Sequence, residues 1–217
     1  MSKKVCIVLS GCGVYDGAEI HESVITLLAL SKAGAAYTIA APHKPQMHVV
    51  NHHTGEEETG AQRYVHVEAA RIARGAVSDV KEIQVDDFDA LFFPGGFGAA
   101  KNLSSFAVEG TQGSVDEDVA SLVQAFHQAN KPIGAVCIAP AVMAMILGKG
   151  TLTIGSDPGT AEAINQLGGS HQTCAVTDFV VDQENKLVTA PAYMCDAQIH
   201  EVAMGIEKAV FAVLEMC

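Results

Sequence analysis

Cys137 is the residue of this sequence best placed to act as a nucleophile. It follows an apolar run at residues 133–136, which predicts a buried strand, and it precedes a helix predicted over residues 141–147. Pro140 is compatible with a first helical turn. A thiol at a strand-to-helix turn lies near a helix N-terminus, whose partial positive charge stabilises a thiolate. A free cysteine alone is more often an inert core residue, so a reactive Cys137 needs partners.

Glu22 is the predicted partner of this thiol. It lies in the first turns of a helix predicted over residues 19–32. A carboxylic acid buried beside a sulfur has a raised pKa, and it can donate a hydrogen bond to a thiolate or move protons. The alternative is a solvated glutamate near a helix N-terminus, which is a common placement.

Backbone amides form the third predicted part of the site. Gly95 and Gly96 follow a strand predicted over residues 89–93. The amides of Gly96 and Ile138 are the expected oxyanion hole, with a simple tight turn as the alternative. Ligands bind at the carboxyl ends of the strands in an open parallel sheet, so residues 10–22, 94–103 and 137–140 converge if the sheet is doubly wound.

Other ligand chemistry has weaker support. The glycine-rich turn at residues 11–17 resembles a dinucleotide fingerprint, but its third glycine comes one position late and no acidic residue ends the following strand. Four histidines lie between residues 43 and 53 without ordered spacing or nearby cysteines. We therefore expect no metal and no cofactor.

Strands alternating with helices must position these residues. Strands are predicted at residues 5–9, 36–41, 89–93, 133–136 and 152–154, a hairpin at 179–189, and helices at 19–32, 63–74 and 199–214, with another opened by a Ser114 to Glu117 capping box. This alternation predicts an α/β fold, with a mostly parallel sheet covered on both faces. We expect one domain over residues 1–217, with a long connection at 43–74.

Composition excludes several function classes. Apolar residues make up 49% of the chain, enough for a sizeable core, and the net charge of −12 disfavours nucleic acid and anionic membranes as partners. The six cysteines show no CxxC spacing, so neither a disulfide framework nor a zinc site is expected. Neither a signal peptide nor a membrane span is evident, which predicts a cytoplasmic protein.

Several segments resemble one known family. Residues 8–22, 51–52, 94–104, 136–140 and 189–193 are similar to the enhancing lycopene biosynthesis (sigma cross-reacting) group of the ThiJ/PfpI superfamily, which has the class I glutamine amidotransferase-like fold. The resemblance implies a flavodoxin-like three-layer α/β/α sandwich, a homodimer, a strained turn at Cys137 and Glu22 against its sulfur. By family name it also implies a link with isoprenoid biosynthesis. Similar proteins are assigned glutathione-independent glyoxalase activity, and others are called proteases, chaperones or deglycases.

One departure from that superfamily narrows the chemistry. Many members carry a histidine after the strand that follows the cysteine helix, but residues 153–157 contain none. Asp157 and His52 are the auxiliary candidates. We expect a lyase that converts methylglyoxal or glyoxal into a 2-hydroxy acid through a Cys137 hemithioacetal. The alternatives are a redox-sensing or regulatory protein that uses Cys137 without turnover, and a hydrolase, which needs a histidine at the thiol.

Overall fold

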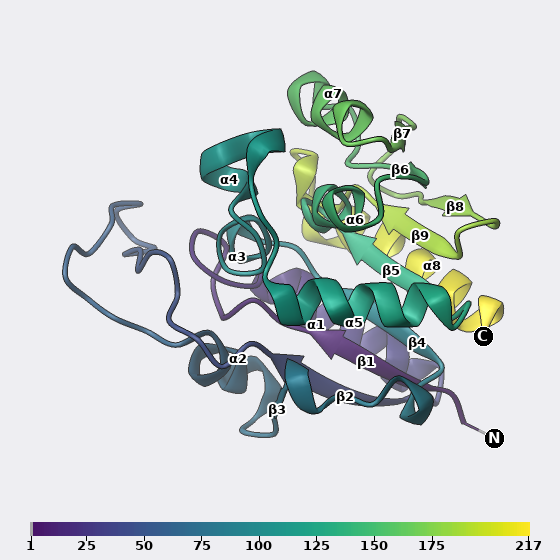
Figure 1. Cartoon of the computed structure of the whole chain (residues 1–217), viewed down its shortest axis with the longest axis horizontal. Helices are drawn as coiled ribbons and strands as arrows, with labels where there is room; N and C mark the ends of the chain where they lie inside the picture. The colour runs from purple at the N-terminus through teal and green to yellow at the C-terminus, as the bar shows by residue number, and fades with distance from the viewer. Residues whose placement is uncertain (1) are drawn as a thin grey trace.

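The computed structural model describes residues 2–217 and places a seven-stranded sheet between two layers of helices (Figure 1). The strands lie in the order β3-β2-β1-β4-β5-β9-β8, and only β8 runs antiparallel to its neighbour. The bounds are β1 Lys4–Val8, β2 Ala36–Ala41, β3 Ser78–Asp79, β4 Ala90–Phe93, β5 Ile133–Val136, β8 Val180–Asp182 and β9 Leu187–Ala190. The predicted flavodoxin-like α/β fold, with an antiparallel pair near the C-terminus, is confirmed.

Eight α-helices surround this sheet within the described residues. They are α1 Ile20–Lys32, α2 Val65–Ala73, α3 Phe97–Lys101, α4 Phe106–Glu109, α5 Glu117–Gln128, α6 Ala139–Leu147, α7 Pro158–Gln166 and α8 Ile199–Met216. Short 3-10 turns lie at Val80–Glu82, Val85–Asp87, Gly110–Gln112 and Ala192–Met194. None of the helices in residues 2–217 is long and apolar enough to cross a membrane.

The core has one cluster on each face of the sheet, because successive strand side chains point to opposite faces. Phe93 packs with Phe126 of α5 on one face, and the neighbouring Phe92 packs with Val210 of α8 on the other. All four side chains are fully buried. The two helical layers therefore fix the sheet from both sides and hold its carboxyl edge in place.

One local prediction is shifted in its bounds and another is wrong. The strand predicted at residues 152–154 is β6 Thr151–Leu152, which pairs with β7 Ser170–His171 in a separate two-stranded sheet. The predicted cap Ser114 is also displaced: Asp116 caps α5 by accepting hydrogen bonds from the amides of Asp118 and Val119. A carboxylate caps as well as a hydroxyl does, and its charge adds a favourable interaction with the helix dipole.

Candidate functional site

Cys137 occupies a strained turn between β5 and α6. Its φ is 61°, in the left-handed region that non-glycine residues rarely adopt. Its amide donates a hydrogen bond of 3.0 Å to the carbonyl of Ala190. Helix α6 begins at Ala139, two residues earlier than predicted, with Pro140 in its first turn. The thiol therefore lies at the carboxyl edge of the sheet, with 7% of the residue exposed.

Glu22 lies against the Cys137 thiol and is completely buried. Its Oε2 accepts the Gly95 amide at 2.8 Å and its Oε1 accepts the Tyr193 amide at 3.2 Å. Burial and, to a smaller extent, the nearby charge of Glu19 raise the pKa of Glu22 to about 7. At neutral pH this carboxyl group can therefore both hold and release a proton.

The pKa of the Cys137 thiol is raised, whereas the sequence suggested a stabilised thiolate. Burial raises the pKa of Cys137 well above its ordinary value, and a charged Glu22 raises it too. The amides of Gly96 and Ile138 hydrogen-bond to the sulfur and lower the pKa. The helix N-terminus favours a thiolate, but desolvation is the larger effect here. Because protonation of Glu22 removes the repulsion, the two groups titrate together.

The glycine pair after β4 is required by close packing. A Cβ on Gly95 would lie 2.3 Å from the Cβ of Cys137 and 2.9 Å from Oε2 of Glu22. Gly96 has a φ of 91°, and its Cβ would lie 2.4 Å from the Gly17 carbonyl oxygen. Only residues without a side chain let these backbone amides approach the thiol so closely.

A cavity of about 620 Å³ opens onto Cys137. Its walls come from the β1–α1 loop, α3, α4, the start of α6, α7 and the turn after β9. The lining residues are Val14, Glu19, Gly96, Phe97, Ala100, Phe106, Ala107, Gly110, Cys137, Ile138, Asp157, Gly159, Thr160, Ala163, Tyr193 and Met194. Most of these present apolar surface, and the only ionisable carboxyl groups among them are those of Glu19 and Asp157.

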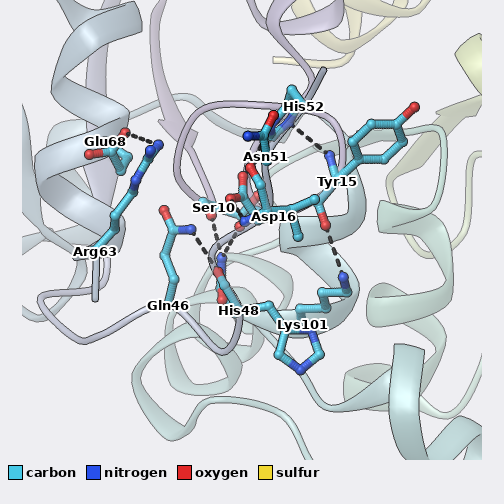
Figure 2. Close-up of polar contacts among 12 residues, drawn as sticks. Ser10, Tyr15, Asp16, Gln46, His48, Asn51, His52, Arg63, Glu68 and Lys101 are labelled. Atoms are coloured by element: carbon cyan, nitrogen blue, oxygen red, sulfur yellow. Dashed lines mark hydrogen bonds and ion pairs between the residues drawn. The ribbon is translucent and has the colours of Figure 1, made fainter. Parts of the chain in front are cut away.

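The two auxiliary candidates occupy different places. Asp157 lines the cavity, but its Oδ2 accepts the Thr160 amide at 2.7 Å as the N-cap of α7, which lowers its pKa. His52 is not among the lining residues. In Figure 2 its ring lies over the β1–α1 loop, where Nε2 accepts the Tyr15 amide at 3.2 Å and Nδ1 donates to the Val50 carbonyl at 3.0 Å. His52 thus anchors the long connection after β2 and does not reach the thiol.

Sequence reasoning missed three polar residues at the site. The Tyr193 hydroxyl lies 2.9 Å from Nδ1 of His21, and the Tyr193 amide holds Glu22. Glu19 caps α1 by accepting the Glu22 amide at 2.7 Å, and it also lines the cavity. The sequence did contain signals for two of these residues. Glu19 is three positions before Glu22 at the start of the predicted helix, which is the spacing of a helix cap. Tyr193 ends residues 189–193, one of the segments that resemble the ThiJ/PfpI superfamily.

Metal ions and disulfides each require a specific arrangement of side chains, and neither arrangement is present in the described residues. Across residues 2–217, no group of three or more His, Cys, Asp or Glu side chains could hold a metal ion. All six cysteines are free.

Curated proteins of three animals are similar over nearly the whole chain. The human glutamine amidotransferase-like class 1 domain-containing protein 3, mitochondrial, is 47% identical over 98% of this chain and 83% of its own. The rat ES1 protein homolog, mitochondrial, is 46% identical over 98% and 84%. The zebrafish (Danio rerio) ES1 protein, mitochondrial, is 33% identical over 98% and 85%.

All three relatives are named as mitochondrial proteins, which contradicts the predicted cytoplasmic location. The prediction had rested on composition and on the absence of a targeting pattern. The physical reason for the error is that a folded domain does not record its compartment. Delivery depends on separate targeting segments that do not take part in the fold.

Solved structures agree with the fold. An isoprenoid biosynthesis protein with amidotransferase-like domain from Ehrlichia chaffeensis has a TM-score of 0.93 at 36% identity, covering 99% of both chains. Drosophila melanogaster DJ-1beta has a TM-score of 0.56 at 21% identity, covering 100% of this chain and 96% of its own, which supports the fold alone.

The match to a family profile covers most of the chain. The profile of the DJ-1/PfpI family matches residues 3–195, which include Cys137, Glu22 and the glycine pair. Together with the relatives above, this shows that the chain belongs to the DJ-1/PfpI family.

Proposed function

We propose that this protein is a cofactor-independent glyoxalase-type enzyme that converts 2-oxoaldehydes into 2-hydroxy acids. The observation that carries the proposal is a thiol that lines one cavity together with Gly96 and Ile138, whose amides hydrogen-bond to the sulfur, and that has a buried carboxyl group with a pKa of about 7 against it. The reaction moves hydrogen within the substrate and then adds water. It therefore needs no external oxidant or reductant.

The first step joins the sulfur to the aldehyde carbon. As the S–C bond forms, Glu22 takes the thiol proton, and the amides of Gly96 and Ile138 stabilise the oxyanion. Glu22 then returns that proton to the oxygen, which leaves a neutral hemithioacetal and a carboxylate. A carboxyl group with a pKa near 7 is suited to both directions of transfer.

The second step moves a proton between carbons. The Glu22 carboxylate removes the proton from the former aldehyde carbon, and the electron pair moves to the ketone oxygen, which gives an enediolate. The hydroxyl proton of the first carbon passes to this second oxygen as Glu22 delivers its proton to the neighbouring carbon, which gives a thioester of the 2-hydroxy acid. Water hydrolyses this thioester and restores the Cys137 thiol.

The alternatives fit the site less well. None of the chain's nine histidines lines the cavity, whereas amide hydrolysis needs a base that also protonates the leaving amine. Oxidation sensing needs a thiol of low pKa, whereas burial raises the pKa of Cys137. The name of the Ehrlichia chaffeensis protein favours a place in isoprenoid biosynthesis, which is compatible with turnover of a carbonyl compound.

The proposal is tested by following lactate formation from methylglyoxal without glutathione. We expect Cys137→Ala to abolish turnover and Glu22→Gln to lower kcat by about 10²-fold or more, because proton transfer loses its carrier. Cys174→Ser is the matched control, since Cys174 is not among the cavity residues, and it should keep full activity. Turnover by Cys137→Ala at the rate of the unaltered protein would rule the mechanism out.

A further inference from the structure

We propose that the cavity beside Cys137 binds an uncharged apolar tail, so that the preferred substrates are hydrophobic 2-oxoaldehydes rather than methylglyoxal. The chemistry of the step rests on the proposed function above. The tail-binding site itself rests on the size, walls and charge of the cavity.

The first argument is size. The cavity measures about 620 Å³, within the range of about 300–1,000 Å³ that holds drug-sized ligands. Methylglyoxal has three carbons and occupies a small part of such a space. The unused volume would stay hydrated, and the binding energy available from its walls would be lost.

The second argument is the chemistry of the walls. Away from the thiol, the lining is mainly apolar and includes Val14, Phe97, Ala100, Phe106 and Met194. Half of Phe97 is exposed, although its neighbours Ala99 and Ala100 are buried. A ligand tail that covered this ring would remove apolar surface from water, which is favourable in proportion to the area buried.

The third argument is charge. Glu19 and Asp157 are the acidic side chains of the lining, and no Lys, Arg or His from residues 2–217 joins them. The chain as a whole carries a net charge of −12. A phosphorylated or carboxylate-bearing carbonyl compound would meet repulsion without a compensating cation, so the tail cannot be anionic, and the apolar walls disfavour burial of a charge of either sign.

The tail site can be tested without turnover, by the rate at which alkylating agents modify Cys137. Iodoacetamide, N-butyl-, N-hexyl- and N-octyl-iodoacetamide carry the same reactive group on tails of increasing length. We expect the rate constant, measured by mass spectrometry of the Cys137 peptide, to rise about two- to fourfold per methylene until the cavity is full. Charged iodoacetate should react more slowly than iodoacetamide.

Two variants locate the tail. Ala163→Phe in α7 fills the cavity and should abolish the dependence on tail length while iodoacetamide still reacts. Val108→Phe is the matched control, because Val108 is 65% exposed on α4 and is not a lining residue. The tail-binding site would be refuted if the rate constant at Cys137 did not change with tail length. It would also be refuted if the rate constant at Cys174 rose with tail length by the same factor.

A second measurement separates this inference from the proposed function. We expect kcat/KM for hexylglyoxal to exceed that for methylglyoxal by at least tenfold, and Ala163→Phe to remove the difference. If Cys137-dependent turnover of methylglyoxal is as fast as that of hexylglyoxal, the tail site is refuted and the proposed function stands. If alkylation accelerates with tail length but no glyoxal is converted, the proposed function is refuted and the tail site stands.

Discussion

Glu22 links the chemistry of the site to the stability of the fold. Its pKa rises from 4.5 to about 7 on folding, so between these values the folded state holds a proton that the unfolded chain releases. The contribution of this proton to the free energy of unfolding is therefore complete below pH 4.5 and is lost as the pH rises through 7. A shift of this size corresponds to about 3 kcal/mol.

The corresponding prediction compares unfolding by urea from pH 4.5 to 8. The free energy of unfolding of the unaltered protein should fall across this range by up to about 3 kcal/mol more than that of Glu22→Gln, which cannot ionise. The comparison uses the slope with pH, since Glu22→Gln also loses an acceptor for the Gly95 or Tyr193 amide. Equal slopes for both proteins would contradict the raised pKa of Glu22.

A substitution at Gly95 tests how closely this glycine packs against Cys137. Gly95→Ala would push a methyl group to 2.3 Å from the Cβ of Cys137, so we expect a loss of about 1–3 kcal/mol in stability and of most activity. Gly159→Ala is the matched control for stability. Its Cβ would meet only Oδ2 of Asp157, at 3.6 Å, and it lies in α7, where alanine is favoured by up to about 1 kcal/mol. A Gly95→Ala protein as stable as this control would show that the turn can relax.

At the scale of elements, the long connection between β2 and α2 is held by buried hydrogen bonds. The Asn102 side chain donates to the carbonyls of Ser10 and Asp16, both at 2.8 Å, and accepts the Met47 amide at 2.9 Å. Asp16 in turn accepts the Val50 amide at 2.8 Å. The connection and the β1–α1 loop therefore form one unit, part of which is drawn in Figure 2.

We expect Asn102→Ala to loosen this unit. The buried carbonyls and amide lose their partner, at a cost of about 1–3 kcal/mol for each unsatisfied group, so hydrogen exchange at Met47 and Val50 should accelerate at least tenfold. Asn51→Ala is the control, because Asn51 makes exposed hydrogen bonds within the same connection. Exchange at Met47 that is unchanged in Asn102→Ala would show that other contacts hold the connection.

The sequence predicts the buried elements better than the small ones. Strands β1, β2, β4 and β5 and helices α1 and α8 follow long apolar patterns, and these patterns persist because burial enforces them. Helices α3 and α4 were missed, since residues 97–109 mix glycine, serine and alanine and form short helices only through tertiary contacts. Strand β3 has two residues and no pattern to detect.

The residues of the site were also easier to predict from the sequence than their environment. Cys137, Glu22 and Gly96 could be placed together because the carboxyl ends of neighbouring strands meet at one edge. The raised pKa of Cys137 could not be predicted, since it depends on how completely the thiol is buried. His52 was a wrong neighbour for the thiol because the direction taken by a long connection is not encoded in strand order.

On the scale of the whole molecule, one face of the helical layer carries exposed apolar side chains. Ile20, Val24 and Leu28 recur every four residues along α1 and are 44%, 49% and 48% exposed. Helix α8 packs beside α1, joined by the Lys32–Glu207 ion pair at 2.6 Å, and presents Met204 and Phe211, each more than 40% exposed. An exposed apolar patch of this kind commonly marks a protein interface.

We therefore expect the protein to form a homodimer across the α1–α8 face, with Val24 near its centre. In size-exclusion chromatography with light scattering, the unaltered chain should have twice the monomer mass and Val24→Glu should have the monomer mass, because two buried carboxylates would face each other without a cation. Val67→Glu is the matched control, since Val67 is 52% exposed on α2, and it should leave the dimer intact. A monomeric unaltered protein, or a dimer that survives Val24→Glu, would place any self-association on another face.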